Sequence, residues 1–206
     1  EVARPILILG CTPPEMAHTL AELGISQTVY SEEYAGELSR AAVEQKAVID
    51  CHVKIDTGMS RIGFFAQHGH EARAAEEIAR VCALPGLSCT GVFTHFACAD
   101  ECAGDSRDYT RMQYRSFLDT VELLEKRGIT FALRHCCNSA AVTWFKEAFH
   151  NSVRVGGILY GHLVMEDGVE PVDIQEIITL RAYITNLHTM PAGESIGYPQ
   201  KFRSGT

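Results

Sequence analysis

Cationic side chains recur near the ends of the apolar segments of this 206-residue chain. Lys54 lies inside one such segment, Arg61 follows seven residues later, and Arg154 lies in another. Burial of a cation is costly unless an anion faces it. Either a carboxylate such as Asp56 pairs with these cations, or an anionic ligand does.

Small hydrogen-bond donors lie near the ends of two of these segments. Gly156 and Gly157 would let backbone N–H groups approach an anion closely, and Ser139 adds a hydroxyl. A Gly-Gly pair by itself is more often a turn than a ligand site. Combined with the cations, the three residues predict a phosphate site.

Three histidines, His52, His95 and His135, also lie in or directly after apolar segments. Histidine is a common zinc ligand, so a metal-dependent hydrolase is one interpretation, and it predicts bound zinc. The eight cysteines include no CxxC pair. We therefore expect reduced, mostly buried thiols and no metal site.

The elements that position these side chains follow from the hydrophobic periodicity. Apolar segments rich in Val and Ile alternate with amphipathic segments at helical spacing. The expected strands are Ile6–Gly10, Gln27–Ser31, Val48–Asp56, Cys89–Phe96, Leu133–Cys137 and Val153–Tyr160. The expected helices are Pro14–Leu23, Ser31–Glu44, Gly69–Val81, Asp108–Arg127 and Ala140–Phe145. This order predicts an α/β fold with a parallel sheet, either doubly wound and open or an incomplete (β/α)8 barrel.

The pattern changes after Gly161. Polar and apolar residues alternate over Ile174–Met190, which predicts a half-exposed antiparallel strand or two. We therefore expect two domains, a partial barrel over residues 1–162 and the truncated start of a β-domain over residues 163–206. The non-Met first residue and the absence of a closing element suggest a fragment of a longer protein.

Composition excludes several classes of function. A formal net charge of -8 without any basic run argues against a nucleic-acid partner. The longest apolar runs are far too short to span a bilayer, and the start of the chain has no signal-peptide pattern. We expect a cytoplasmic protein with a small-molecule ligand.

Five segments resemble, in order and approximate spacing, those of bacterial alanine racemases: HVKIDTGMSRIGF, GVFTHFACAD, HCCNSAA, VRVGGILYG and PAGESIGY. The resemblance covers essentially the whole chain, and TGMSRIGF and PAGESIGY are its most specific strings. It implies a (β/α)8 TIM-type barrel that binds pyridoxal 5'-phosphate (PLP), here without its early strands, followed by a β-domain. It also implies a homodimer that interconverts L- and D-alanine, supplying D-alanine for the cell wall.

The resemblance also implies a role for each matching residue. Arg154 should face the pyridine nitrogen of PLP, and Arg61 should bind the ring hydroxyl and the substrate carboxylate. Lys54 matches a lysine that is often carbamylated in the family; an unmodified lysine paired with Asp56 is the alternative. The remaining cofactor-binding residues should be Ser139, Asn138, Gly156, Gly157 and His95.

Tyr198 matches the tyrosine acid/base of the family, which acts in the active site of the partner subunit. The resemblance makes His95 the partner of that tyrosine and links it to Arg154, so these three are the expected catalytic residues. His135 is expected to hydrogen-bond beside the site rather than to act as a base. Pro199 follows the tyrosine where the family usually has glycine.

The cofactor-binding lysine of the family lies in a string like VVKANAYGHG, which is absent from this chain. Lys46 has the wrong neighbours. Racemisation needs one base on each face of the substrate, so we expect this chain alone to be inactive. A serine racemase of the same family and a PLP-binding carrier protein without turnover are the alternatives.

Overall fold

The computed structural model of the chain describes residues 4–101, 103–163, 172–196 and 201–205. These residues fall into two compact units, Glu1–Glu176 and Ile177–Thr206. The predicted domain boundary between residues 162 and 163 stays a prediction.

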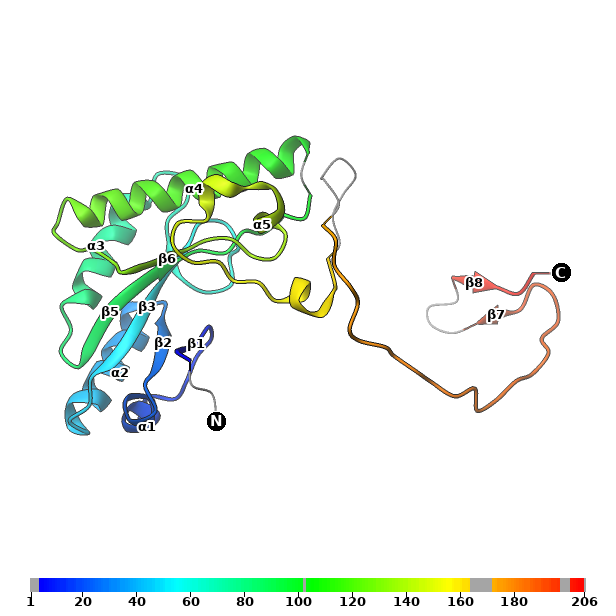
Figure 1. Cartoon of the computed structure of the whole chain (residues 1–206), viewed down its shortest axis with the longest axis horizontal. Coiled ribbons are helices and arrows are strands. Elements are labelled where there is room, and N and C mark those ends of the chain that lie inside the picture. The colour runs from blue at the N-terminus through cyan, green and yellow to red at the C-terminus, as the bar shows by residue number, and fades with distance from the viewer. Residues whose placement is uncertain (1–3, 102, 164–171, 197–200, 206) are drawn as a thin grey trace. The chain divides into compact units, whose positions relative to one another are not determined.

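The first unit is built on a parallel sheet (Figure 1). Its strands are β1 (Ile6–Ile8), β2 (Ile25–Val29), β3 (Ile49–Asp56), β5 (Leu87–Phe93) and β6 (Leu133–His135), in that order. A short strand, β4 (Phe64–Phe65), also pairs with β3. Each strand lies beside the next in the chain, without the reversal of order that marks a doubly wound sheet. The sheet is therefore a segment of a (β/α)8 barrel, as predicted.

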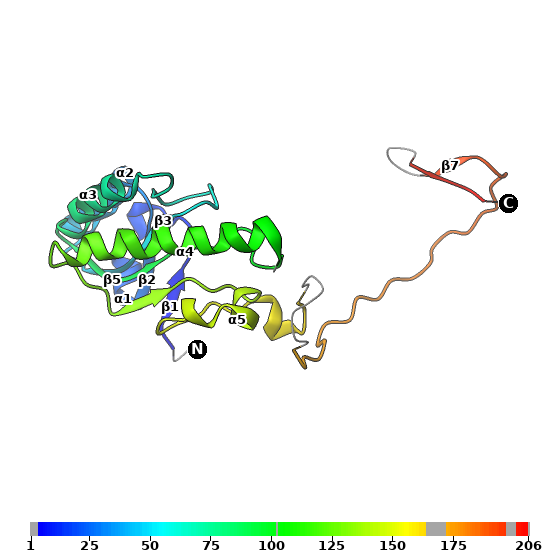
Figure 2. The same cartoon turned by 90° about the horizontal axis from the view of Figure 1, so that it is seen from above.

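Helices connect the strands and pack against one another in the order of the chain (Figure 2). The connecting helices are η1 (Pro14–Met16), α1 (Ala17–Glu22), α2 (Glu32–Glu44), α3 (Glu71–Cys82) and α4 (Gly104–Glu125). Three short helices follow β6: α5 (Ala141–Trp144), η2 (Lys146–Ala148) and η3 (Gly157–Tyr160). Consecutive packing of this kind is how crossover helices form the outer layer of a barrel. No helix among the described residues is long and apolar enough to cross a membrane.

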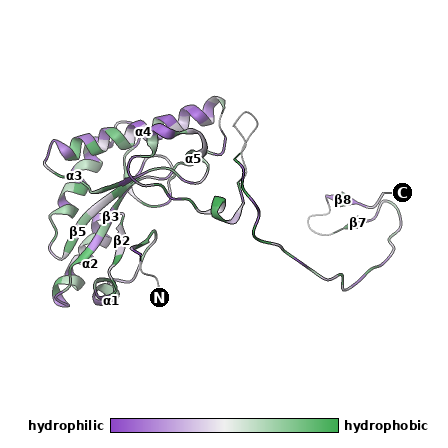
Figure 3. Ribbon diagram, in the orientation of Figure 1, coloured by the Kyte–Doolittle hydropathy of each residue, from purple (hydrophilic) through white to green (hydrophobic). Residues whose placement is uncertain are grey.

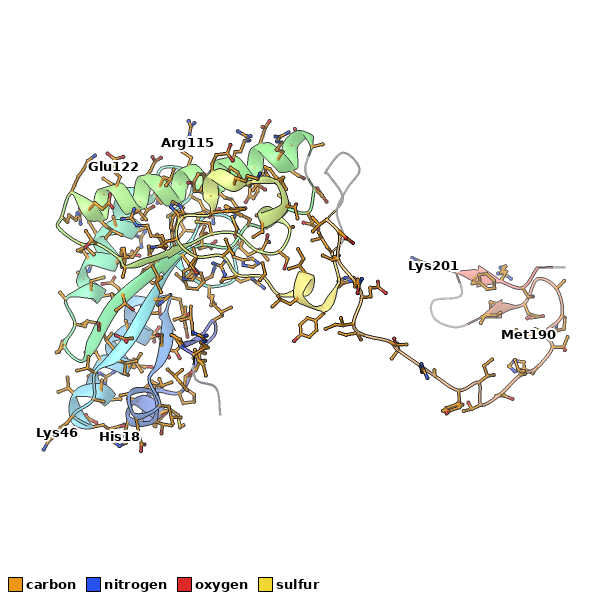
Figure 4. The ribbon with its side chains drawn as sticks, in the orientation of Figure 1. His18, Lys46, Arg115, Glu122, Met190 and Lys201 are labelled. Carbon is orange, nitrogen blue, oxygen red and sulfur yellow. The ribbon has the colours of Figure 1, made fainter. Side chains whose placement is uncertain are left out.

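The core lies between the sheet and these helices. Leu38, Ile78 and Phe117 from α2, α3 and α4 are fully buried, as are Val53 and Ile55 of β3. Along the longer helices α2, α3 and α4, apolar positions alternate with polar ones at helical spacing (Figure 3). The polar side of α4 carries Arg115 and Glu122, whose side chains point away from the sheet (Figure 4).

Two predicted strands are wrong. Residues 153–156 have no regular secondary structure, and η3 follows them; only Ser152 makes an isolated bridge, to His135. The backbone of Gly156, at φ -124° and ψ -84°, departs from an extended strand. Residues 172–190 have no regular secondary structure either, because no described strand pairs with them. The second unit contains one short antiparallel hairpin, β7 (Ser195–Ile196) with β8 (Phe202–Arg203).

The start of α2 shows how local sequence fixes an element. Ser31 is extended, and its hydroxyl accepts a hydrogen bond from the N–H of Tyr34 at 3.2 Å. Glu32 and Glu33 occupy the first turn, where negative charge interacts favourably with the helix dipole. The helix begins at Glu32, one residue after the predicted start, and Ser31 caps it.

Replacement of Ser31 by Ala should lower the free energy of unfolding by about 1 kcal/mol, because one N–H of the first turn loses its acceptor. Urea denaturation of the two proteins measures the difference. S31D keeps an acceptor at the same position and should stay close to wild type. Equal destabilisation by S31A and S31D would contradict this role for the hydroxyl.

Candidate functional site

A cavity of about 480 Å³ lies at the carboxyl ends of the strands in the first unit. Its lining includes four residues expected to bind or act on a ligand: Lys54, Arg61, His95 and Arg154. Phe93, the last residue of β5, also lines it. The parallel register places the ends of these strands at one edge, so side chains more than ninety residues apart in the sequence meet there.

Arg154 is the centre of this site. Its Nη1 donates to the carbonyl of His135 at 2.8 Å, and its Nη2 donates to the carbonyls of Thr94 and Cys136 at 2.6 and 3.1 Å. The same two nitrogens contact Nδ1 of His135 at 2.6 Å and Nδ1 of His95 at 3.3 Å. Burial lowers the pKa of Arg154 to about 10, so the side chain is still a cation at neutral pH.

These contacts leave the Nε–H of Arg154 without a hydrogen-bond partner among the described residues. A guanidinium has five N–H groups and no acceptor. Nη1 and Nη2 of Arg154 therefore donate to groups of the protein, while its Nε–H can donate to a ligand.

The histidines around Arg154 are held neutral. Burial, reinforced by the charge of Arg154, lowers the pKa of His95 to about 4 and that of His135 to about 3. A neutral imidazole can accept the N–H of a guanidinium through its unprotonated nitrogen. Both rings thus stabilise the cation without adding charge.

Lys54 is almost completely buried, and its Nζ has no hydrogen-bond partner among the residues that the structure describes. The Asp56 carboxylate instead accepts the backbone N–H groups of Gly58 and Ser60, at 3.1 and 2.9 Å. The expected alternative, an ion pair between Lys54 and Asp56, is therefore wrong: the carboxylate stabilises the turn that follows β3. Burial, with a contribution from Arg154, lowers the pKa of Lys54 to about 8.

Two of the expected phosphate ligands lie together. The N–H of Gly156 donates to Oγ of Ser139 at 2.9 Å, and no atom lies within 4 Å of where a Cβ on Gly156 would be. Asn138 has a structural contact instead: its Oδ1 accepts the N–H of Ala141 at 3.0 Å, at the start of α5. Cofactor binding by Asn138 and Gly157 stays a prediction, and Tyr198 lies outside the described residues.

Sequence reasoning missed the carbonyls that hold Arg154 and the aromatic ring beneath it. Phe93 stacks on His135 with ring centroids 4.7 Å apart, and the cationic groups of Arg154 and Lys54 each lie 5.0 Å from its centroid. An apolar residue that ends a strand carries no visible signal of this role. Backbone acceptors carry none at all.

The geometry disfavours a metal-dependent hydrolase. Nδ1 of His52 lies 2.8 Å from Nε2 of His135, whose other nitrogen faces Arg154. Both ring nitrogens of His135 and Nδ1 of His52 thus already face each other or a cation. Among the described residues, no group of three or more His, Cys, Asp or Glu side chains is placed to hold a metal ion.

The fold and the cavity define an α/β-barrel protein whose ligand site lies at the carboxyl ends of the strands. The family described as "Alanine racemase, N-terminal domain" matches residues 1–164. This chain belongs to the alanine racemase family.

Individual relatives agree with this assignment. Alanine racemase of Desulforamulus reducens is 39% identical, over 94% of this chain and 51% of its own length, and that of Clostridium tetani is 35% identical, over 97% and 50%. A structure of alanine racemase from Clostridium difficile 630 is similar to this chain with a TM-score of 0.78 at 32% identity, over 99% of this chain and 52% of its own. The chain therefore spans about half the length of the relatives it matches.

Lys54 should make stability depend on pH. Because burial lowers its pKa from 10.5 to about 8, the folded state binds fewer protons than the unfolded chain between these values, and stability rises with pH there. Replacement by Met should remove this rise and stabilise the protein at pH 7 by roughly 3 kcal/mol. Urea unfolding across this pH range, in CO₂-free buffer, measures both effects. A K54M protein with an unchanged pH profile would show that the amine is not buried.

Proposed function

We propose that the protein that carries this chain is a PLP-dependent alanine racemase, which interconverts L- and D-alanine and supplies D-alanine for peptidoglycan. The observation that carries the proposal is the fixed Arg154 guanidinium, with its spare donor, in a cavity at the strand ends. The family assignment supports it. So do two related structures of alanine racemases: that from Bacillus anthracis (TM-score 0.75, 28% identity) has bound L-Ala-P, and one from Clostridium difficile is a complex with cycloserine.

The residues present fit PLP. The free Nε–H of Arg154 suits the pyridine nitrogen, which accepts a hydrogen bond when unprotonated. The Ser139 hydroxyl and the N–H of Gly157 suit the phosphate, and the N–H of Gly156, which donates to Ser139 Oγ, would turn to the phosphate when it binds. PLP supplies an electron sink that makes the α-hydrogen of a bound amino acid acidic.

Arg154 sets how strong that sink is. A cation facing the pyridine nitrogen opposes its protonation, which limits electron withdrawal into the ring. His95 and His135 are neutral, so neither is a proton donor to the ring at neutral pH. This environment favours return of the proton to the α-carbon over side reactions such as transamination.

Proton transfer requires a base on each face of the α-carbon. We assign one to Tyr198, which would enter the site of the partner subunit in a homodimer, with His95 as its hydrogen-bond partner. The other is a lysine that this chain does not contain, so the chain alone should not racemise alanine. Cations nearby would lower the pKa of the phenol toward neutrality.

Lys54 is proposed to be carbamylated. Its amine is buried and unpartnered, and its lowered pKa leaves a useful fraction neutral near pH 8. The neutral amine would attack CO₂; an N–C bond forms and a proton leaves to solvent. The resulting anion would replace a buried cation and orient Arg61, which lines the same cavity and would bind the substrate carboxylate.

With PLP bound, the whole protein should convert L-alanine to D-alanine, and serine should be the poorer substrate. Y198F should lower kcat by about 100-fold or more, because one base is lost. Y183F, at a tyrosine that is 95% exposed, is the matched control and should keep wild-type activity. Chiral analysis of the products measures the rates. PLP binding without racemisation of either amino acid would favour the carrier-protein alternative.

Carbamylation has its own spectroscopic test. Addition of ¹³C-bicarbonate at pH 8 should produce one carbamate resonance in the ¹³C NMR spectrum of the protein. K54R should abolish it, because an arginine does not form the carbamate under these conditions. K46R, at an exposed lysine, should retain it. A resonance that persists in K54R would place the modification elsewhere.

A further inference from the structure

A chain of hydrogen bonds extends from Arg154 to His52. Arg154 Nη1 contacts Nδ1 of His135 at 2.6 Å, and Nε2 of His135 contacts Nδ1 of His52 at 2.8 Å. His52 lies near the middle of β3, His135 is the last residue of β6, and Arg154 lies in the segment without regular structure that precedes η3. The proposed function uses Arg154 and His135 but gives His52 no role.

The direction of this chain follows from the chemistry of the guanidinium. Because Arg154 can only donate, Nδ1 of His135 must be the acceptor. In a neutral imidazole the other nitrogen then carries the proton, so Nε2 of His135 donates to His52. Nδ1 of His52 must therefore be unprotonated, and burial keeps the pKa of His52 below its usual value.

The backbone of β5 is shaped to admit the ring of His52. Cys51 of β3 pairs with Cys89, but His52 pairs with Gly91, so Thr90 is an extra residue that shifts the register. Directly paired residues point to the same face of a sheet. A Cβ on Gly91 would lie 2.5 Å from three atoms of the His52 ring, so only glycine leaves space for the imidazole.

We infer that His52 is a positioning residue, which fixes the tautomer and orientation of His135 so that its unprotonated nitrogen faces Arg154. Gly91, which has no side chain, leaves the space that the His52 ring occupies. His52 contacts His135, which contacts the Arg154 guanidinium, and His52 does not line the cavity that Lys54 and Arg61 share. Its effect reaches the cofactor site only through His135. Only the kinetic consequences of this inference rest on the proposed function.

The direct test is ¹⁵N NMR of the histidine rings in the whole protein. His135 should be protonated at Nε2 and unprotonated at Nδ1, and Nδ1 of His52 should be unprotonated. H52N places a carbonyl oxygen where Nδ1 was and should keep the hydrogen-bonded ring N–H resonance of His135. H52L has similar size without an acceptor and should lose it. Protonation of His135 at Nδ1 in the wild type would overturn the inference.

Kinetics give a second readout. H52L should lower kcat by tenfold to about 100-fold through misplacement of Arg154, with KM changed by less than about twofold. H52N should recover most of the loss. Wild-type kcat in H52L, or equal losses in H52L and H52N, would contradict a positioning role that depends on the acceptor. A wild-type protein without racemase activity but with the expected tautomers would refute the proposed function and leave the inference intact.

Gly91 supplies a test that does not require H52L to fold. G91A should lower kcat in the wild type, because its Cβ displaces the imidazole. The same change should cost much less in an H52A background, since alanine has neither the Cγ nor the ring atoms that the Cβ would contact. Equal losses in the two backgrounds would show that the gap at Gly91 does not serve His52.

Discussion

The site depends on a buried guanidinium held by backbone carbonyls. Arg154 binds the carbonyls of Thr94, His135 and Cys136, and no carboxylate among the described residues forms an ion pair with it. These carbonyls lie just after β5 and at the end of β6, where the sheet leaves acceptors unpaired. One side chain satisfies them and gains a fixed orientation. Carbonyl dipoles, rather than an anion, offset the cost of burying the guanidinium. Its positive charge is therefore not neutralised and stays available to a ligand.

The barrel geometry makes this arrangement possible. Parallel strands in chain order bring their carboxyl ends to one edge of the sheet. The crossover helices cover one face of the sheet and bury its apolar side chains. The irregularities occur where the site needs them. The extra residue at Thr90 brings Gly91 opposite His52, and the loss of extended structure at Gly156 brings its N–H to Ser139. The first irregularity lies beside the positioning residue His52, and the second lies at a proposed phosphate contact.

Much of the fold and part of the site could be predicted from the sequence. Periodicity predicts β1, β2, β3, β5 and β6, because each is an apolar segment, and Ser31 predicts the start of α2. It misses the short strand β4. Hydrophobic periodicity wrongly predicts strands at Val153–Tyr160 and Ile174–Met190. A strand also needs a second strand to pair with, and the local sequence does not show whether one lies beside it. The cations and glycines of the site have chemical signatures. The carbonyls around Arg154 and the stacking on Phe93 have none, because they arise only when distant segments meet.

The most direct test of this account concerns the ring nitrogen that Arg154 is proposed to face. The whole protein reconstituted with PLP labelled with ¹⁵N in the pyridine ring would report by NMR whether that nitrogen carries a proton. A cation fixed by carbonyls, with its Nε–H free and two neutral histidines beside it, predicts an unprotonated nitrogen across the neutral pH range. A protonated pyridine nitrogen at neutral pH would contradict the central role assigned to Arg154.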